Sequence, residues 1–159
     1  MTDVLASNAV RLPATPEAVD AVHGQLERLW EVADFVPALD RMAFETAVVE
    51  AASNAVRHAV AASGAVLEIG VEATVTRRRL EARICEYGAV VPDLDPAALA
   101  GGDPGRDPAH GAGEPDTGEN APESGRGLAL IRALVTTLRF ERRDGTNIWT
   151  LSRDSPASG

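Results

Sequence analysis

The sequence has little cysteine and no long uninterrupted apolar run, and these shortages exclude several classes of protein. Cys85 is the only cysteine, which excludes an internal disulfide framework. It lies in an alternating apolar run, so we expect a half-buried strand residue rather than a nucleophile. No apolar run approaches the roughly 20 residues that a membrane-spanning helix needs, and the N-terminus lacks the pattern of a secretory signal. We therefore expect a cytoplasmic protein.

Positive charge is also scarce. The chain has 15 Lys and Arg against 24 Asp and Glu, which gives a formal net charge of −9 at pH 7. Nucleic acids and anionic membranes are bound mainly by clustered basic side chains, so direct binding to either is disfavoured. Apolar residues are plentiful, at 45% of 159 residues, which is enough for one sizeable core and too little for two. We expect a single domain over residues 1–159.

The N-terminal half carries two helical patterns. Thr15-Pro16-Glu17 supplies an N-cap, a proline at the first helical position and an acid in the first turn. Apolar residues then recur at spacings of three and four, which predicts a helix to about Ala33, before Pro37 interrupts the pattern. A second, alanine-rich helix is predicted over residues 40–61, with Gly64 ending it.

Alternating apolar and polar residues predict the strands. Residues 67–71 and 80–85 each have one apolar face, and the short connection between them indicates an antiparallel hairpin. Residues 10–12 form a further short extended segment. Two more strands, 138–142 and 147–152, flank Asp144-Gly145, which is a strong turn signal.

Hydrophobic periodicity disappears between residues 100 and 124, where Gly, Pro, Asp and Glu dominate. Such a composition predicts a long loop or a mobile lid. Order returns with a helix of about three turns that begins near Leu128.

A polar stripe runs through the second predicted helix, because Glu50, Asn54 and His58 follow one another at every fourth position. Asn54 offers a neutral carbonyl oxygen to Mg²⁺, and Glu50, one turn earlier, can accept a proton from an attacking hydroxyl. Glu45 is a rival base, but five residues turn a helix by about 500°, which places it off this face. A solvated helix face is the structural alternative, and His58 is given no chemical role.

Two later segments carry groups suited to phosphate. Gly125 and Gly127 let the backbone approach an oxyanion, and the helix expected from Leu128 presents free N–H groups. Arg126 can add a charged contact, and Thr146 opens the last strand. The structural alternatives are a loop-to-helix junction for the glycines and a β-branched strand residue for Thr146.

Taken in this order, the motifs resemble the GHKL ATPases, the superfamily of the ATP domains of DNA gyrase, heat-shock chaperones and histidine kinases. Within it they are most similar to the anti-sigma-factor serine/threonine kinases. The matching residues are Glu50-x-x-x-Asn54-x-x-x-His58, the segment from Gly125 to Ile131, and Gly145-Thr146. The resemblance implies an α/β sandwich, with helices on one face of a mixed, mostly antiparallel sheet and a mobile lid at about 100–124.

The resemblance also implies ATP and Mg²⁺ as cofactors, with Glu50 as the catalytic base and Asn54 as the Mg²⁺ ligand. By the same resemblance the second glycine motif holds phosphates and Thr146 lines the nucleotide site. The residues of that motif are Gly125, Arg126, Gly127 and Leu128.

The first glycine motif departs from the family pattern of Asp-x-Gly-x-Gly. This chain has Glu86-Tyr87-Gly88-Ala89-Val90, in which Gly88 is kept. Glu86 keeps an acceptor for the adenine amine but is longer by one methylene, enough to shift a hydrogen bond by about 1 Å. Val90 has less backbone freedom than the glycine it replaces.

We therefore expect an ATP–Mg²⁺-dependent serine/threonine kinase that acts as an anti-sigma factor, a regulator of transcription. Its implied partners are a sigma factor and an anti-anti-sigma protein of the STAS type, and a homodimer is implied as well. The alternative is a non-catalytic anti-sigma binding module with weak or lost ATP binding, which Glu86 and Val90 motivate. A sensor-kinase ATP domain is a third reading, disfavoured because no helix pair with a phosphoacceptor histidine precedes the domain in this sequence.

Overall fold

The computed structural model describes residues 3–92 and 123–155 of the chain. In chain order the elements are β1 (Val4–Pro13), α1 (Pro16–Val32), α2 (Ala38–His58), β2 (Glu68–Thr76), β3 (Arg79–Tyr87), α4 (Glu123–Leu134), β4 (Thr137–Arg143) and β5 (Thr146–Asp154). The five strands form one sheet in the order β1-β2-β3-β5-β4. Every pairing between these strands is antiparallel. The predicted α/β sandwich is confirmed, and its sheet is antiparallel throughout the described strands rather than mixed.

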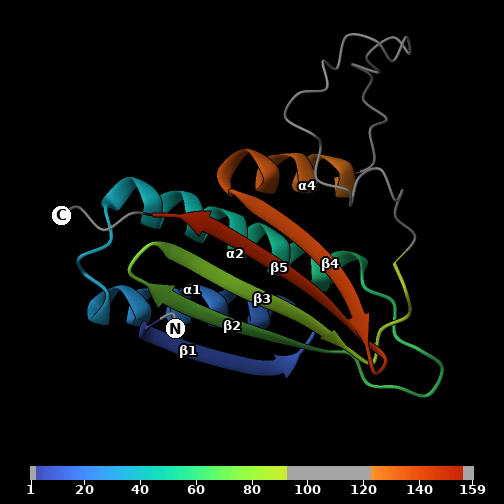
Figure 1. Cartoon of the computed structure of the whole chain (residues 1–159). Coiled ribbons are helices and arrows are strands. Elements are labelled where there is room, and N and C mark those ends of the chain that lie inside the picture. Colours follow the sequence, from blue (N-terminus) through green and yellow to red (C-terminus); the bar gives the residue numbers. More distant parts are fainter. Residues whose placement is uncertain (1–2, 93–122, 156–159) are drawn as a thin grey trace, which may run out of the picture.

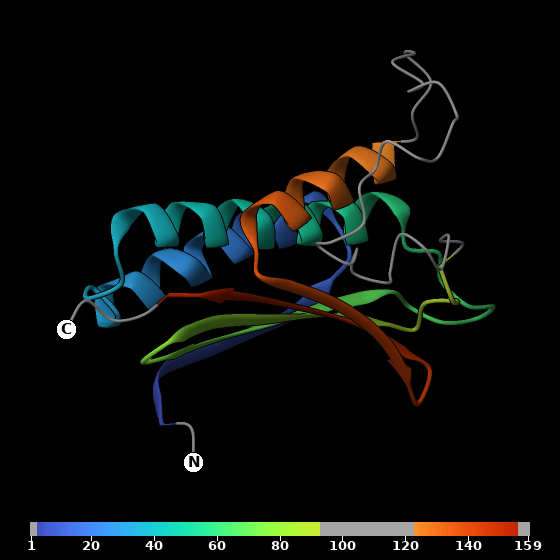
Figure 2. The ribbon, with the colours of Figure 1, turned by 45° about the horizontal axis from the view of Figure 1, so that its top comes forward.

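The helices all lie on one face of the sheet, as Figures 1 and 2 show from two directions. α1 packs against β1 and α2, and α4 packs against α2. α2 is therefore the central helix of the layer. None of the helices in the described part of the chain is long and apolar enough to cross a membrane.

One apolar core lies between the helix layer and the sheet. The alanines of α2 are small, so neighbouring helices and strands approach its backbone closely, as the alanine-rich sequence predicts. The apolar faces of the predicted strands also point into this core. Its largest fully buried side chains include Leu26 and Leu29 of α1, Phe44 of α2, Ile69 of β2, Leu80 and Ile84 of β3, Ile131 of α4 and Leu151 of β5.

The turn between β4 and β5 follows the sequence signal. Asp144 has φ 51° and Gly145 has φ 75°, and Arg143 pairs directly with Thr146 across the turn. Two central residues with positive φ are typical of the type I′ turn, whose twist matches that of paired strands. The hairpin prediction is confirmed at this point.

Three boundaries differ from the sequence prediction. β1 is much longer than residues 10–12, because it pairs with β2 along nearly its whole length. α2 ends at His58 rather than at residue 61, since the next residues leave the helix to pair with the segment after β3. α4 begins at Glu123, so the second glycine motif lies inside a helix and not before one. The remainder of the predicted lid, residues 100–122, lies outside the described residues.

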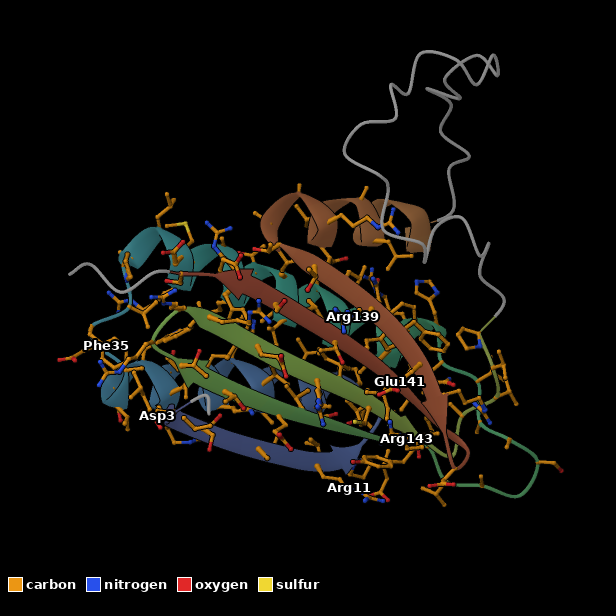
Figure 3. All side chains as sticks on the ribbon, in the orientation of Figure 1. Asp3, Arg11, Phe35, Arg139, Glu141 and Arg143 are labelled. Carbon is orange, nitrogen blue, oxygen red and sulfur yellow. The ribbon has the colours of Figure 1, made fainter. Side chains whose placement is uncertain are left out.

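The face of the sheet opposite the helices carries charged side chains. Figure 3 marks Arg11 on β1 and Arg139, Glu141 and Arg143 along β4. β1 and β4 are the two edges of the sheet. Charged residues on edge strands discourage pairing with a strand of another molecule.

We expect burial in the core to decide how much each leucine contributes to stability, and two leucines test this. Leu26 is fully buried, whereas Leu39 is 70% exposed. Leu26→Ala should lower the free energy of unfolding by about 2–5 kcal/mol, because it leaves a cavity. Leu39→Ala, the matched control, should change it by less than about 0.5 kcal/mol. Urea unfolding followed by circular dichroism measures both, and equal losses would contradict the described packing.

Candidate functional site

A cavity of about 350 Å³ lies between the helix layer and the sheet. Its walls come from α2, β3, α4, β4 and β5, and from the segments that follow α2 and β3. Among its described lining residues, the polar ones are Asn54, His58 and Glu86, with the indole of Trp149; the rest are apolar. A mostly apolar cavity of this size with a few convergent polar groups is typical of small-molecule sites.

Glu86 is the buried carboxylate of this cavity and is only 5% exposed. Its Oε1 accepts a hydrogen bond from Asn147 Nδ2 at 3.0 Å, and its Oε2 accepts one from Trp149 Nε1 at 3.2 Å. Burial raises the pKa of the Glu86 carboxyl, and the two hydrogen bonds offset part of that effect. Each oxygen keeps further acceptor capacity, because an ionised carboxylate has about four lone-pair sites.

The first glycine motif is clamped to the β4–β5 hairpin. Asn147 Nδ2 also donates to Val90 O at 2.8 Å, and Arg142 donates both to Ala89 O at 3.0 Å and to Asn147 Oδ1 at 2.6 Å. Gly88 has φ +78°, and a Cβ there would lie 2.8 Å from the Val66 carbonyl oxygen. The glycine is therefore required by the turn itself.

Glu50 and Asn54 lie on one face of α2, as their spacing predicts, and the structure adds Arg57 to them. Arg57 Nη2 lies 3.4 Å from both Glu50 Oε1 and Asn54 Oδ1. These contacts are long and partly exposed, so they contribute little stability. They place a guanidinium group directly beside the carbonyl oxygen expected to bind a cation.

Gly127 brings α4 onto this same face. A Cβ at Gly127 would lie 2.5 Å from Asn54 Nδ2 and 2.8 Å from Glu50 Oε1. Any residue other than glycine would displace one or both side chains. The second glycine motif and the polar stripe of α2 therefore meet in space, although about 70 residues separate them in the chain.

Glu50 and Asn54 open onto different spaces. Asn54 lines the cavity, whereas Glu50 lines an open groove of about 530 Å³ along α1 and α2. Glu45 lines the same groove, but its carboxylate accepts a hydrogen bond from Trp30 Nε1 at 3.2 Å and lies 3.7 Å from His23 Nδ1. Glu50, and not Glu45, is the carboxylate adjacent to Asn54.

The other predicted site residues divide into three groups. Leu128 lines the cavity, and so does His58, which had been given no role. Gly125 and Arg126 lie in the first turns of α4, where the structure describes the backbone course but not their surroundings. Thr146 pairs with Tyr87 and so lies on the opposite face of the sheet from Glu86.

Three residues beside these groups were missed by sequence reasoning. Asn147, and not Thr146, is the cross-strand partner of Glu86, because the β3–β5 register pairs them directly. Trp149 lies two residues further along the same face. Arg57 carried a usable signal, since it stands three residues after Asn54 and seven after Glu50 on the same helix face.

The donor set suits Mg²⁺ held by few protein ligands. The described residues contain no cluster of three or more His, Cys, Asp or Glu side chains that could hold a metal ion. Mg²⁺ usually keeps several waters and binds through one or two protein oxygens together with phosphates. Asn54, whose side chain lines the cavity and offers one neutral carbonyl oxygen, fits that mode.

Comparisons with known proteins identify the family and the fold of the chain. The family model of the histidine kinase-like ATPase domain matches residues 12–153. No curated protein matched the chain. Among solved structures the chain is similar to the RsbU and RsbW domains of Rv1364c from Mycobacterium tuberculosis, with a TM-score of 0.58 and 21% sequence identity. The match covers 94% of this chain and 32% of that one, so this chain spans about a third of its length.

We expect Gly127→Ala to disturb the polar face of α2. Alanine in a helix normally gains up to about 1 kcal/mol over glycine, but here its Cβ must displace Asn54 or Glu50. Gly24→Ala in α1 is the matched control, because only the flexible end of Arg28 lies near, at 3.3 Å. Gly24→Ala should stabilise the protein and Gly127→Ala should not, in urea unfolding. A shift of the Asn54 side-chain amide signals in NMR spectra should accompany Gly127→Ala alone.

The buried Glu86 predicts a pH dependence of stability. Its pKa is raised above the usual 4.5, so the folded chain keeps a proton that the unfolded chain has already released. Stability should therefore fall as pH rises from about 4.5 through the raised pKa. Glu86→Gln removes this contribution, so the stability difference between wild type and variant should change across that window. Urea unfolding at a series of pH values measures it, and parallel profiles would refute the assignment.

Proposed function

The chain belongs to the family of histidine kinase-like ATPase domains, and from this premise we propose that it is an ATP- and Mg²⁺-dependent protein kinase that acts as an anti-sigma factor. In this proposal its acceptor is a serine or threonine of a STAS-type anti-anti-sigma protein, and its other partner is a sigma factor. The order of the motifs supports this branch of the family. The fold that the chain shares with the structure containing an RsbW domain supports it too.

The observation that carries the proposal is that Asn54 and Glu50, one turn apart on the same face of α2, line two different spaces. Asn54 faces a cavity of nucleotide-compatible size and shares it with the buried Glu86. Glu50 faces an open groove. A nucleotide approaching from the cavity and a hydroxyl approaching along the groove would meet at this turn of α2. Phosphoryl transfer depends above all on such positioning.

The roles of the residues follow from their chemistry. Asn54 would hold Mg²⁺ through its carbonyl oxygen, and Glu86 would accept a hydrogen bond from the adenine amine. Glu50 would take the proton of the acceptor hydroxyl. The chain contains no lysine, so any side-chain cation that contacts phosphate must be an arginine or a protonated histidine. Arg57, already beside Asn54, is the described arginine placed for that contact.

Bound Mg–ATP would supply the phosphoryl group and the electrophilic phosphorus. The protein would position the phosphates beside Asn54, where the backbone of α4 comes close to α2 at Gly127. It would also hold Glu50 at the groove, beside the incoming hydroxyl.

A non-catalytic anti-sigma module remains the second candidate function, because Glu86 and Val90 depart from the family pattern. The backbone at Val90 weakens that argument. Among the described residues, Asp144 is the one non-glycine residue with positive φ, so Val90 occupies its position without the conformation that only glycine favours. Its N–H also donates to Val60 O at 2.8 Å.

We expect the purified chain to bind ATP with Mg²⁺ in a calorimetric titration, and Asn54→Ala to abolish that binding. With radiolabelled ATP and an anti-anti-sigma protein encoded beside this chain, label should appear on the partner. Glu50→Gln should slow transfer about 10²–10⁴-fold with ATP binding retained, because it removes the base but not the nucleotide site.

Glu27→Gln serves as the matched control, because Glu27 is an exposed carboxylate of α1 outside the cavity and the groove, and its transfer rate should equal that of wild type. Loss of transfer in Glu45→Gln rather than Glu50→Gln would move the base to Glu45. Absence of any ATP binding, together with tight binding to a sigma factor, would replace the kinase by the sequestering module.

A further inference from the structure

Each oxygen of the Glu86 carboxylate accepts a hydrogen bond from a side chain of β5. We propose that Asn147 and Trp149 are positioning residues that fix the Glu86 carboxylate as a hydrogen-bond acceptor for an amino group of the cavity's ligand. This inference rests on the proposed nucleotide site. Asn147 and Trp149 belong to neither glycine motif. In this role they compensate for the extra methylene of Glu86.

Asn147 has no freedom to turn. It is fully buried, and both hydrogens of its amide nitrogen are used, one by Glu86 and one by the Val90 carbonyl. Its Oδ1 accepts from the Arg142 guanidinium, which can only donate. If the amide group of Asn147 were turned by about 180°, its NH₂ group would face the Arg142 guanidinium, and two donors would oppose each other. Asn147 consequently presents an N–H group, and never its oxygen, to Glu86.

Trp149 is fixed in a different way. Its ring packs against Phe140 with a centroid separation of 4.7 Å, and its Nε1 reaches the second carboxylate oxygen of Glu86. The indole itself lines the cavity. One oxygen of Glu86 is thus held by Asn147 and the other by Trp149. A side chain with three rotatable bonds is reduced to one orientation.

The chemistry of these partners determines what Glu86 can recognise. Both are N–H donors, so they stabilise the ionised carboxylate against the effect of burial. The remaining lone pairs of an ionised carboxylate can only accept hydrogen bonds. The other ionisable side chain among the described lining residues is His58 on α2. A ligand that places an amino group at Glu86 is therefore favoured over one that places a hydrogen or a carbonyl oxygen there.

The contact itself can be tested without any nucleotide, because the chain has two tryptophans, each with its indole nitrogen 3.2 Å from a glutamate oxygen. In NMR spectra of the full chain, Glu86→Gln should move the indole N–H signal of Trp149 and leave that of Trp30 in place. Glu45→Gln should do the reverse. An indole N–H signal of Trp149 that does not move in Glu86→Gln would overturn the proposal.

The consequence for binding is tested with two ligands, ATP and purine riboside triphosphate, which lacks the amino group. Trp149→Phe keeps the ring but removes the N–H, and should weaken ATP binding about tenfold while leaving the analogue within about twofold. Trp30→Phe should change neither. In the Glu86→Gln background, Trp149→Phe should cause little further loss of affinity for ATP, because Trp149 acts through Glu86.

Equal weakening of both ligands by Trp149→Phe would mean a merely structural role and would defeat the proposal. If the wild-type chain bound neither ligand, the proposed function would fall. The indole signals would then still decide whether Asn147 and Trp149 hold Glu86, since a Trp149 signal that responds to Glu86→Gln supports the contact and a silent one refutes it.

Discussion

The burial of one carboxylate, Glu86, constrains much of the site around it. Removing a carboxylate from water is costly unless hydrogen-bond donors replace the lost hydration. Here the donors come from β5, so the β3–β5 register has to place Asn147 directly opposite Glu86. A slip of one residue would turn Tyr87 toward the cavity and leave Glu86 on the outer face. The pairing of β3 with β5 therefore supplies the hydrogen-bond donors that the buried Glu86 carboxylate needs.

α2 separates two spaces, the cavity and the groove. Its alanines let α4 and the sheet approach closely, and its polar face remains between the cavity and the groove. The contact with Gly127 brings the backbone of α4 within van der Waals reach of Asn54 and Glu50. A bulkier helix or a larger residue at 127 would separate these groups. Small residues are therefore as necessary to the site as the polar ones.

Sequence reasoning succeeded where the signal was local. Helix periodicity gave α1 and α2, alternation gave β2 and β3, and Asp144-Gly145 gave the last turn, because each depends on residues close together in the chain. The face shared by Glu50 and Asn54 is also local, being set by helix geometry alone. It did not reveal that the two residues open onto different spaces, which depends on how α1 and α4 pack.

Features that depend on contacts between distant parts of the chain were not predicted from the sequence, for a physical reason. Thr146 and Asn147 are equally close to the turn, and only the pairing of β5 with β3 decides which one faces the cavity. The start of α4 was placed too late because glycines are poor helix formers, whereas packing against α2 overrides that preference. The end of α2 was placed too far along, since the competing partner of residues 60–62 lies about 30 residues away in sequence.

That early ending of α2 also restricts how the chain can vary. The carbonyl of Val60 accepts from Val90 N, the carbonyl of Val90 accepts from Asn147, and Asn147 donates to Glu86. An insertion or deletion just after His58 would shift Val60 and break this series at its first link. Homologues that gain or lose a residue there should therefore also differ at the position of Asn147, so the loop length and this side chain are expected to be inherited together.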